Sequence, residues 1–316
     1  MAATVPLKVL RRLRAVPEGT VTVLCYHTLS ADDQGPDAWT ALRIGDFRTQ
    51  IAFLRRWFDI VDLDTAFGET RIRAGGKPLA VVTFDDGDVG LYQHLIPFLA
   101  ADPIPVTVYV ATSQIESGTP YWFDQVMNAL QAPVAVALTL DELGTWQFGT
   151  ESGAARWQVL GALLEAMKTL SPARRADLTA RIVAQSDDRA GQGPRLGPMS
   201  VTQVQALASC PGVTIGAHSH CHNLLDQIPL DEARTSVSTS RRLLQDWTGQ
   251  DVRHFAYPNG NHDAALRAML RDEGFSTAVA LDNGLAQPGA DMFALSRIAV
   301  GRHDPFWRIR MRLAGV

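Results

Sequence analysis

The chain has 316 residues, of which 46% are hydrophobic and 20% charged, so it can bury one large α/β core or two smaller ones. Its net charge of -4 provides no basic surface that would follow a phosphate backbone, which argues against nucleic acid as a partner. Three scattered cysteines are too few for a disulfide framework, and their odd number favours a reducing compartment.

The first residues bear on location and on membrane contact. Residues 7–14 place leucines on one side and basic residues on the other side of a short amphipathic helix. We expect this helix to pack on the fold, and contact with an anionic membrane is the less favoured alternative. No secretory signal is visible, and no apolar stretch reaches the roughly 18 residues that span a bilayer. The expected location is therefore the cytoplasm, unless an export signal precedes the sequence given.

Predicted strands and helices alternate along much of the chain. Short apolar, β-branched runs predict buried strands at 21–27, 79–84, 106–110, 213–216 and 277–281. Between them we expect a helix from a cap at Asp46 to about 58 and a short helix capped by Asp64. Further helices are expected at 91–100 and after a cap at Ser200. This alternation is typical of a parallel α/β sheet or barrel.

Residues 121–197 interrupt the alternation. Leucines, methionine and tryptophan recur through a long, mostly helical stretch that ends in a Gly/Pro-rich segment at 191–194. No cluster of acidic residues or histidines accompanies it. We therefore interpret 121–197 as a helical insertion within a single domain that covers 1–316, rather than as a separate catalytic domain.

The run at 79–84 ends in Asp85, Asp86 and Gly87. Carboxylates at the C-terminal end of a buried parallel strand lie at the functional rim of an α/β fold. A simple Asp-Gly turn with solvated acids is the alternative. His27 ends the first predicted strand in the same way, although a lone histidine there is more often structural than catalytic.

A histidine cluster, His218, His220 and His222, follows another predicted strand. Histidines four apart in a helical turn project to the same side, whereas an extended strand would align all three, so the local conformation decides whether His220 belongs. One carboxylate, from Asp85 or Asp86, and two imidazoles would leave coordination positions open for water and substrate, as in catalytic zinc sites. These residues predict a metal site.

Three segments carry a family resemblance. Thr-Phe-Asp-Asp-Gly at 83–87, His-Ser-His-Cys-His at 218–222 and Phe-Ala-Tyr-Pro-Asn-Gly at 255–260 resemble, in order and spacing, the first three motifs of the polysaccharide deacetylases, the NodB-homology domains of carbohydrate esterase family 4. The resemblance extends from about 26 to 301, and 121–124 looks like the aromatic-rich start of an insertion found in some bacterial members. It implies a distorted (β/α) barrel and metal-dependent removal of acetyl groups from N-acetylated sugars.

The resemblance also implies roles for single residues. Asp86, His218 and His222 would hold a divalent metal, zinc first, with cobalt, nickel or manganese as alternatives. Asp85 would be the general base, because the cation neutralises Asp86 whereas Asp85 stays free to take a proton from water. Backbone amides near Asn259 would help to stabilise the oxyanion.

Two positions depart from the family pattern. Ala256 stands where an arginine usually orients the catalytic aspartate, and Arg297 stands where a histidine usually acts as general acid. Arginine stays charged and is a poor proton donor, but Arg297 could orient Asp85 from a new direction. The general acid would then be His27 first, His303 as a weaker candidate, or metal-bound water.

Weaker signals concern the rim and the C-terminus. Trp122 and Tyr257 could stack on a sugar ring, with ordinary packing an equal alternative. The turn at 282–284 is expected on the same rim. Residues 307–313 alternate apolar and basic side chains and could form an edge strand, a helix end or an anionic surface contact.

Together these features predict a metal-dependent hydrolase that removes N-acetyl groups from an acetylated amino sugar in a polysaccharide, an oligosaccharide or a glycolipid. A carbohydrate is the expected partner. One alternative is a catalytically silent carbohydrate-binding relative that keeps the metal but has lost the acid and the orienting arginine. The other is a metal-dependent amidohydrolase that acts on a small non-sugar amide.

Overall fold

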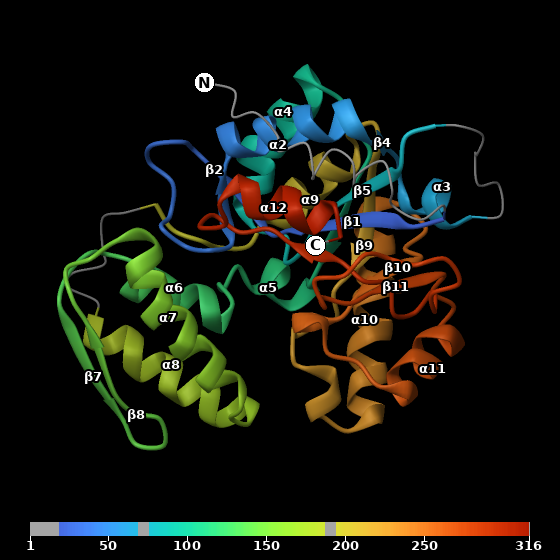
Figure 1. The fold of residues 1–316 in the computed structure, drawn as a ribbon. Coiled ribbons are helices and arrows are strands. Elements are labelled where there is room, and N and C mark those ends of the chain that lie inside the picture. Colours follow the sequence, from blue (N-terminus) through green and yellow to red (C-terminus); the bar gives the residue numbers. More distant parts are fainter. Residues whose placement is uncertain (1–18, 69–75, 187–193, 316) are drawn as a thin grey trace.

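The computed structural model describes residues 19–68, 76–186 and 194–315 (Figure 1). The amphipathic helix predicted at 7–14 lies outside these ranges. Within them, no helix combines the length and the apolar character that crossing a membrane requires.

A curled sheet of parallel strands forms the centre of the fold (Figure 1). Its strands follow the order β11-β10-β9-β6-β5-β1-β12, and β4 pairs with β5 outside this path. The bounds are β1 (Val21–Tyr26), β4 (Asp59–Ile60), β5 (Leu79–Phe84), β6 (Val106–Val110), β9 (Val213–Ala217), β10 (His254–Ala256), β11 (Thr277–Val279) and β12 (Ile298–Ala299).

The two ends of this sheet meet. Leu295, just before β12, forms a parallel bridge with Val279 of β11, and its carbonyl accepts a hydrogen bond from the amide of Ala280 at 2.8 Å. Because β12 itself pairs with β1, the strands close into a ring. The predicted distorted (β/α) barrel is confirmed.

Apolar strands are buried on both faces, as a parallel sheet covered by helices requires. All six residues of β1 and all five of β6 are buried. Inside the ring, Val23, Val81, Tyr109, Ala256 and Val279 pack against one another. This packing fixes the C-terminal ends of the strands, where the polar residues lie.

Helices surround the barrel, and two short strands pair beside it. They are β2 (Thr28–Ser30), β3 (Ala41–Arg43), α2 (Ile44–Trp57), α3 (Leu63–Phe67), η1 (Leu91–Leu95), α4 (Ile96–Ala101), α5 (Thr112–Ser117), α9 (Val201–Ala208), η2 (Leu225–Gln227), α10 (Leu230–Thr248), η3 (Pro258–Gly260), α11 (Ala264–Asp272) and α12 (Phe306–Leu313). The helix expected at 91–100 is therefore a π-helical turn followed by α4, and the segment at 307–313 is a helix.

Two of the three predicted helix caps are wrong. The helix with Asp46 in its first turn begins at Ile44, so this carboxylate lies inside the helix. The N-cap residue Arg43 makes no side-chain cap, and the amide of Gly45 donates instead to Asp32 Oδ1 at 2.7 Å. Asp62 caps α3 in place of Asp64, because its carboxylate accepts a hydrogen bond from the amide of Thr65 at 2.6 Å. The cap at Ser200 is confirmed as a reciprocal capping box.

The segment predicted as an insertion lies to one side of the barrel (Figure 1). It contains α6 (Trp122–Leu130), α7 (Gly153–Lys168) and α8 (Pro172–Ser186). These helices pack around a hydrophobic core of their own, which includes Leu138, Leu160 and Leu178. An antiparallel hairpin, β7 (Val136–Leu140) and β8 (Gly144–Phe148), interrupts the expected helical run. The assignment of this segment as an insertion within one domain stays a prediction.

Arg156 joins three parts of this segment. Its side chain is only 2% exposed, and its guanidinium donates to the carbonyls of Leu130, Val134 and Gly149. We expect Arg156→Met to lower the free energy of unfolding by about 2–4 kcal/mol in urea titrations, because buried carbonyls lose their donors at about 1–3 kcal/mol each. The exposed neighbour Arg174 is the matched control, and Arg174→Gln should change stability by less than about 0.5 kcal/mol. Equal effects of both variants would contradict a structural role for Arg156.

Candidate active site

The chain turns sharply where β5 and β9 end. After β5, Asp86 and Gly87 take left-handed backbone angles, with φ of 74° and 82°. After β9, Ser219 and His222 do the same, with φ of 63° and 52°. Such angles strain a residue that carries a side chain and gather at functional sites. The left-handed residues other than glycine in the described chain are Asp86, Ser219, His222, Asn259 and Asn283. All five follow the C-terminal ends of strands at this rim, with Asn259 inside the short helical turn η3.

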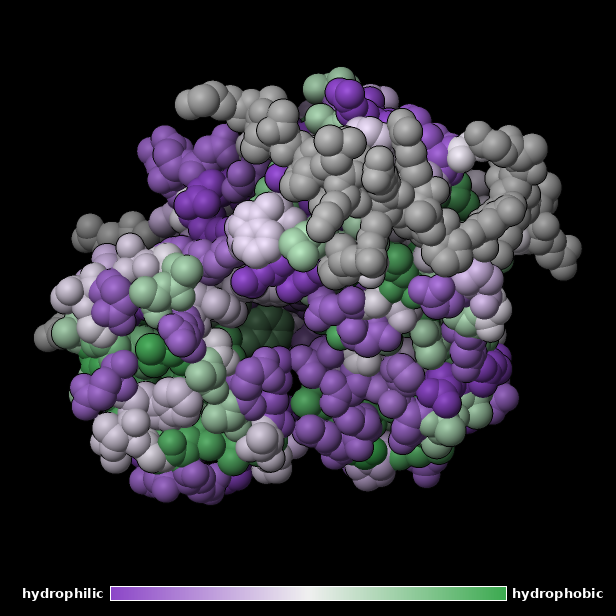
Figure 2. Space-filling model, in the orientation of Figure 1, coloured by the Kyte–Doolittle hydropathy of each residue, from purple (hydrophilic) through white to green (hydrophobic). Residues whose placement is uncertain are grey.

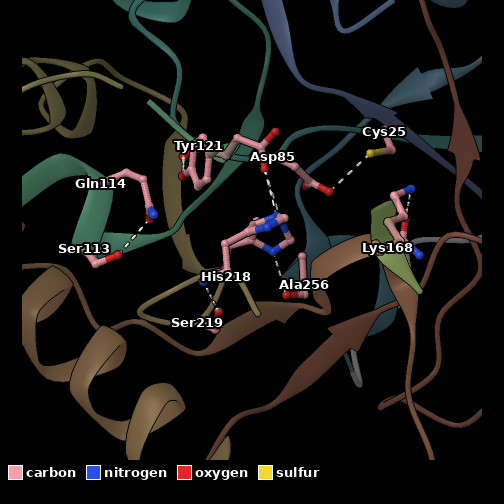
Figure 3. A network of polar contacts seen from close by, with 12 residues as sticks. Cys25, Asp85, Ser113, Gln114, Tyr121, Lys168, His218, Ser219 and Ala256 are labelled. Atoms are coloured by element: carbon pink, nitrogen blue, oxygen red, sulfur yellow. Dashed lines mark hydrogen bonds and ion pairs between the residues drawn. The ribbon is translucent and has the colours of Figure 1, made fainter. Parts of the chain in front are cut away.

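These turns bring three ligand-type side chains together. Asp86 Oδ1 lies 3.4 Å from His218 Nε2 and 3.2 Å from His222 Nε2, and the two Nε2 atoms are 3.2 Å apart. His218 Nδ1 lies 2.7 Å from the carbonyl of Ala256 and donates its proton there, so Nε2 is the atom that faces Asp86 and would bind a metal once it carries no proton (Figure 3).

This trio fits a divalent metal. Ligand atoms about 2.0–2.1 Å from a tetrahedral zinc ion lie about 3.3 Å from one another, which is the spacing found here. Lone pairs on Asp86, His218 and His222 at such distances repel unless a proton or a cation lies between them. The donor set therefore meets the requirement for a metal site.

His220 is not part of the trio. Its Nδ1 lies 2.8 Å from Thr112 Oγ1, and its amide donates to Ser236 Oγ. The amide of His222 donates to Ser219 Oγ at 3.1 Å, so the loop folds back instead of continuing as an extended strand. His218 and His222 are therefore paired as considered for a helical turn, but residues 218–222 form a loop that is neither helical nor extended.

Charge within the trio follows from these contacts. Burial raises the pKa of Asp86, but hydrogen bonds from His218 and His222 more than offset it and hold that pKa well below the usual range. Burial lowers the pKa of His218, and the hydrogen bond with Asp86 outweighs this effect and raises the pKa. Asp86 is therefore an ionised carboxylate.

Arg297 holds the second carboxylate. Its Nη1 and Nη2 donate to Oδ1 and Oδ2 of Asp85, each at 2.7 Å, and both side chains are buried. The guanidinium also donates to the carbonyl of Ala280 and to Thr83 Oγ1. Burial raises the pKa of Asp85, but the charge and hydrogen bonds of Arg297 hold it below its usual value. Arg297, the residue before β12, thus reaches Asp85 from a different side than a residue at position 256 in β10 would.

A second group of ligand-type atoms surrounds Asp85. Cys25, His27 and Asp85 have ligand atoms within 4.8 Å of one another, and the Cys25 thiol donates to Asp85 at 3.4 Å (Figure 3). Burial raises the pKa of Cys25 well above its usual value, so the thiol stays protonated. Because Arg297 already engages both oxygens of Asp85, this group fits a hydrogen-bond network rather than a metal.

The trio opens into a cavity of about 570 Å³ between the barrel and the predicted insertion. Figure 2 shows the hollow between these two parts of the surface. His27, Asp85, Asp86 and Asn259 line it from the barrel. The opposite wall belongs to the segment at 121–197, with Trp122, Phe123, Trp157, Glu165, Lys168 and Arg175. A cavity of this size suits a small organic ligand.

The two histidines considered as general acids, His27 and His303, differ in whether they line this cavity. His27 lines the cavity, and its ring lies 5.5 Å from that of Trp39. Burial is the main reason that the pKa of His27 is lowered, so its imidazole is neutral at pH 7. His303 does not line this cavity; its ring lies 6.3 Å from Trp157, on the side of Asp37.

The two predicted aromatic residues, Trp122 and Tyr257, differ in whether they face the cavity. Trp122 lines the cavity, in agreement with a sugar-facing position. Tyr257 is a candidate for contact with substrate, with ordinary packing as the equal alternative, and packing is what the structure shows: the ring is fully buried and its hydroxyl donates to the carbonyl of Phe293 at 2.9 Å. Asn259 lines the cavity and accepts a hydrogen bond from Lys168 Nζ at 2.6 Å.

Sequence reasoning missed Lys168 and Arg175, because the insertion carries no acidic or histidine cluster. One signal was available for Arg175. It lies three, four and seven residues before Leu178, Thr179 and Ile182, on the buried face of α8. A charged residue on the apolar face of a helix needs an explanation that a solvent-facing residue does not.

We expect Arg297→Met to lower the free energy of unfolding of the metal-free protein by about 3–5 kcal/mol, because it leaves Asp85 charged, buried and without its partner. Urea titration followed by circular dichroism measures this change. Arg297→Lys keeps the positive charge but not the paired N–H donors of the guanidinium, so its free energy of unfolding should fall by less than that of Arg297→Met. A loss below about 1 kcal/mol in Arg297→Met would contradict the importance of the pair.

Comparisons with known proteins agree with this geometry. The family described as polysaccharide deacetylase matches residues 193–278, whereas curated protein sequences give no match. Streptococcus pyogenes deacetylase PplD, solved in complex with acetate, has a similar fold at a TM-score of 0.59 and 14% identity, over 90% of this chain and 99% of that one. IcaB from Ammonifex degensii gives 0.56 and 18%, over 93% and 97%. The resemblance to the polysaccharide deacetylases of carbohydrate esterase family 4 is thereby confirmed, in sequence over residues 193–278 and in fold over about nine-tenths of the chain.

Proposed function

We propose that this chain is a metal-dependent hydrolase that removes N-acetyl groups from an acetylated amino sugar in a polysaccharide, an oligosaccharide or a glycolipid. The observation that carries the proposal is the buried pair of Arg297 and Asp85 beside the trio of Asp86, His218 and His222. The family match and the shared fold support the same reaction class.

Asp86, His218 and His222 would hold the metal. Two imidazoles and one carboxylate favour zinc, with cobalt, nickel or manganese as alternatives. When bound, such an ion would supply Lewis-acid chemistry at the acetamide carbonyl. The hydrogen bond from His218 to the carbonyl of Ala256 keeps the imidazole oriented for this task.

Asp85 is the proposed general base. Arg297 keeps its carboxylate ionised and fixed, and a carboxylate has about four lone-pair sites, so one remains for a water molecule after Arg297 and Cys25 are bound. In the proposed reaction, the water oxygen forms a bond to the acetyl carbon while its proton passes to Asp85. The bond from carbon to nitrogen then breaks, which leaves acetate.

The leaving amine must gain a proton. Arg297 cannot supply it, because it stays charged and is bound to Asp85. His27 remains the first candidate, since it lines the cavity close to Asp85 and its Nδ1 has no partner among the described residues. Because its imidazole is neutral at pH 7, it would first accept the proton that Asp85 took from water and then donate a proton to the amine. His303 is no longer a candidate, because it does not line this cavity.

The substrate class follows from the walls of the cavity. Trp39, Trp122 and Trp157 line it, and flat aromatic faces suit the apolar faces of sugar rings. Polar groups from Asn259, Lys168 and Glu165 lie among them and could bind hydroxyl groups. A carbohydrate is therefore proposed in preference to a small non-sugar amide.

Metal content tests the ligand assignment. We expect the purified protein to bind about one zinc ion per chain, and His218→Ala and His222→Ala each to lower the affinity by at least about tenfold, because each removes a ligand. His220→Ala is the matched control and should keep the wild-type content. Titration with zinc, followed by elemental analysis, measures all four proteins. Full zinc content in His218→Ala would exclude the proposed ligand set.

Acetate release tests the reaction. We expect the zinc-loaded protein to release acetate from an N-acetylglucosamine oligomer, and Asp85→Asn to reduce kcat by about 10²–10⁴-fold, the usual contribution of a general base. The variant should keep its zinc, because Asp85 is not a proposed ligand. Binding of the oligomer by calorimetry without any acetate release, from wild-type protein with zinc, cobalt or nickel, would favour a silent carbohydrate-binding relative.

A further inference from the structure

Arg175 is a buried cation without a polar partner. Its side chain is 3% exposed, lies on the buried face of α8 and lines the cavity opposite the Asp86 trio. Within the part of the chain that the structure describes, no carboxylate or hydrogen-bond acceptor contacts its guanidinium. The ring of Trp122 lies 5.1 Å from the guanidinium carbon, in a cation–π arrangement.

Other buried arginines show what a structural role looks like. Arg156, in the same segment and equally buried, donates to three backbone carbonyls. Arg297 donates to both oxygens of Asp85. The guanidinium of Arg175 has five N–H donors and none of these contacts. Burying a charge without a partner is unfavourable, so Arg175 is not explained by the stability of the fold.

The surroundings of Arg175 favour an anion. Burial alone accounts for the lowered pKa of Arg175, and no neighbouring carboxylate offsets it, although arginine keeps its charge in proteins. Lys168 lines the same cavity, where its charge is already paired with Glu165 at 2.6 Å. Arg175 is therefore the unneutralised charge on this wall, and Trp122 holds its plane.

We propose that Arg175 is the centre of a subsite for an oxyanion group of the substrate, so that this chain acts on an acidic acetylated sugar rather than on a neutral one. A guanidinium fork binds a carboxylate or a phosphate through two parallel hydrogen bonds. The anion would be the carboxylate of a neighbouring uronic acid or a phosphate ester on the sugar. This inference rests on the proposed function for the identity of the sugar, but the anion subsite can be tested without turnover.

Calorimetry with the metal-free protein tests the subsite. Three ligands differ in charge: N,N′-diacetylchitobiose, the disaccharide of glucuronate and N-acetylglucosamine, and N-acetylglucosamine 6-phosphate. We expect at least one acidic ligand to bind at least about tenfold more tightly than the neutral one, the usual effect of a charged hydrogen-bond pair. Which acidic ligand gains identifies carboxylate or phosphate as the source of the anion.

The variants locate the effect. Arg175→Gln should reduce the preference for the acidic ligand to less than about threefold and leave the neutral ligand unchanged. Arg174→Gln is the matched control, because the adjacent Arg174 is exposed and pairs with Glu142 and Asp177 outside the cavity, and it should keep the preference. Equal affinity for all three ligands in the wild-type protein, or a preference that survives Arg175→Gln, would overturn the proposal.

Thermal unfolding separates the subsite from a structural role. Arg175→Gln should keep or raise the midpoint temperature, since it removes an unpaired buried charge, whereas Arg156→Met should lower it by several degrees. A similar fall of the midpoint temperature in Arg175→Gln would show that Arg175 stabilises the fold, and this result would overturn the proposal.

Acetate release from neutral and acidic sugars at equal rates would contradict the subsite but leave the deacetylase function intact. Tighter binding of the acidic ligand without any acetate release would support the subsite and contradict the deacetylase function.

Discussion

The buried ion pair between Asp85 and Arg297 is the contact on which the rest of the site depends. Two charges removed from water are stable only with good geometry and full hydrogen bonding, and here two N–H donors meet two carboxylate oxygens at 2.7 Å each. Two of the three remaining donors of Arg297 reach Thr83 and the carbonyl of Ala280. The pair therefore fixes the position and the charge of Asp85, beside the three residues that could hold a metal.

Closure of the barrel makes this pair possible. Leu295 bridges to Val279 on one side and β12 pairs with β1 on the other, so Arg297 is carried to a place beside the end of β5. Ala256 lies in the barrel interior, where a small side chain leaves the approach to Asp85 to Arg297. The segment at 121–197 then supplies the opposite wall, with aromatic rings and the unpaired charge of Arg175. The proposed chemistry and the proposed selectivity thus belong to different parts of the chain.

Much of the fold could be predicted, because apolar β-branched runs define buried strands, and 79–84 and 106–110 match β5 and β6 at both ends. Positions that depend on tertiary contacts could not. Whether His220 joins the cluster depends on a loop that folds back at Ser219. The position of Tyr257 stayed open because an aromatic residue after a strand can face either the cavity or the core. The hairpin at 136–148 was missed because two five-residue strands give a weaker signal than the helices around them.

A double-mutant cycle between Asp85 and Arg297 tests most directly whether this pair controls catalysis. The rate constant kcat/KM for acetate release is measured for the wild-type protein, Asp85→Asn, Arg297→Gln and the double variant, with zinc content determined for each. If Arg297 acts by holding Asp85, each single variant loses most of the activity while keeping its zinc. The double variant should then be no worse than the worse single variant. Losses that add in free energy would contradict this role for Arg297.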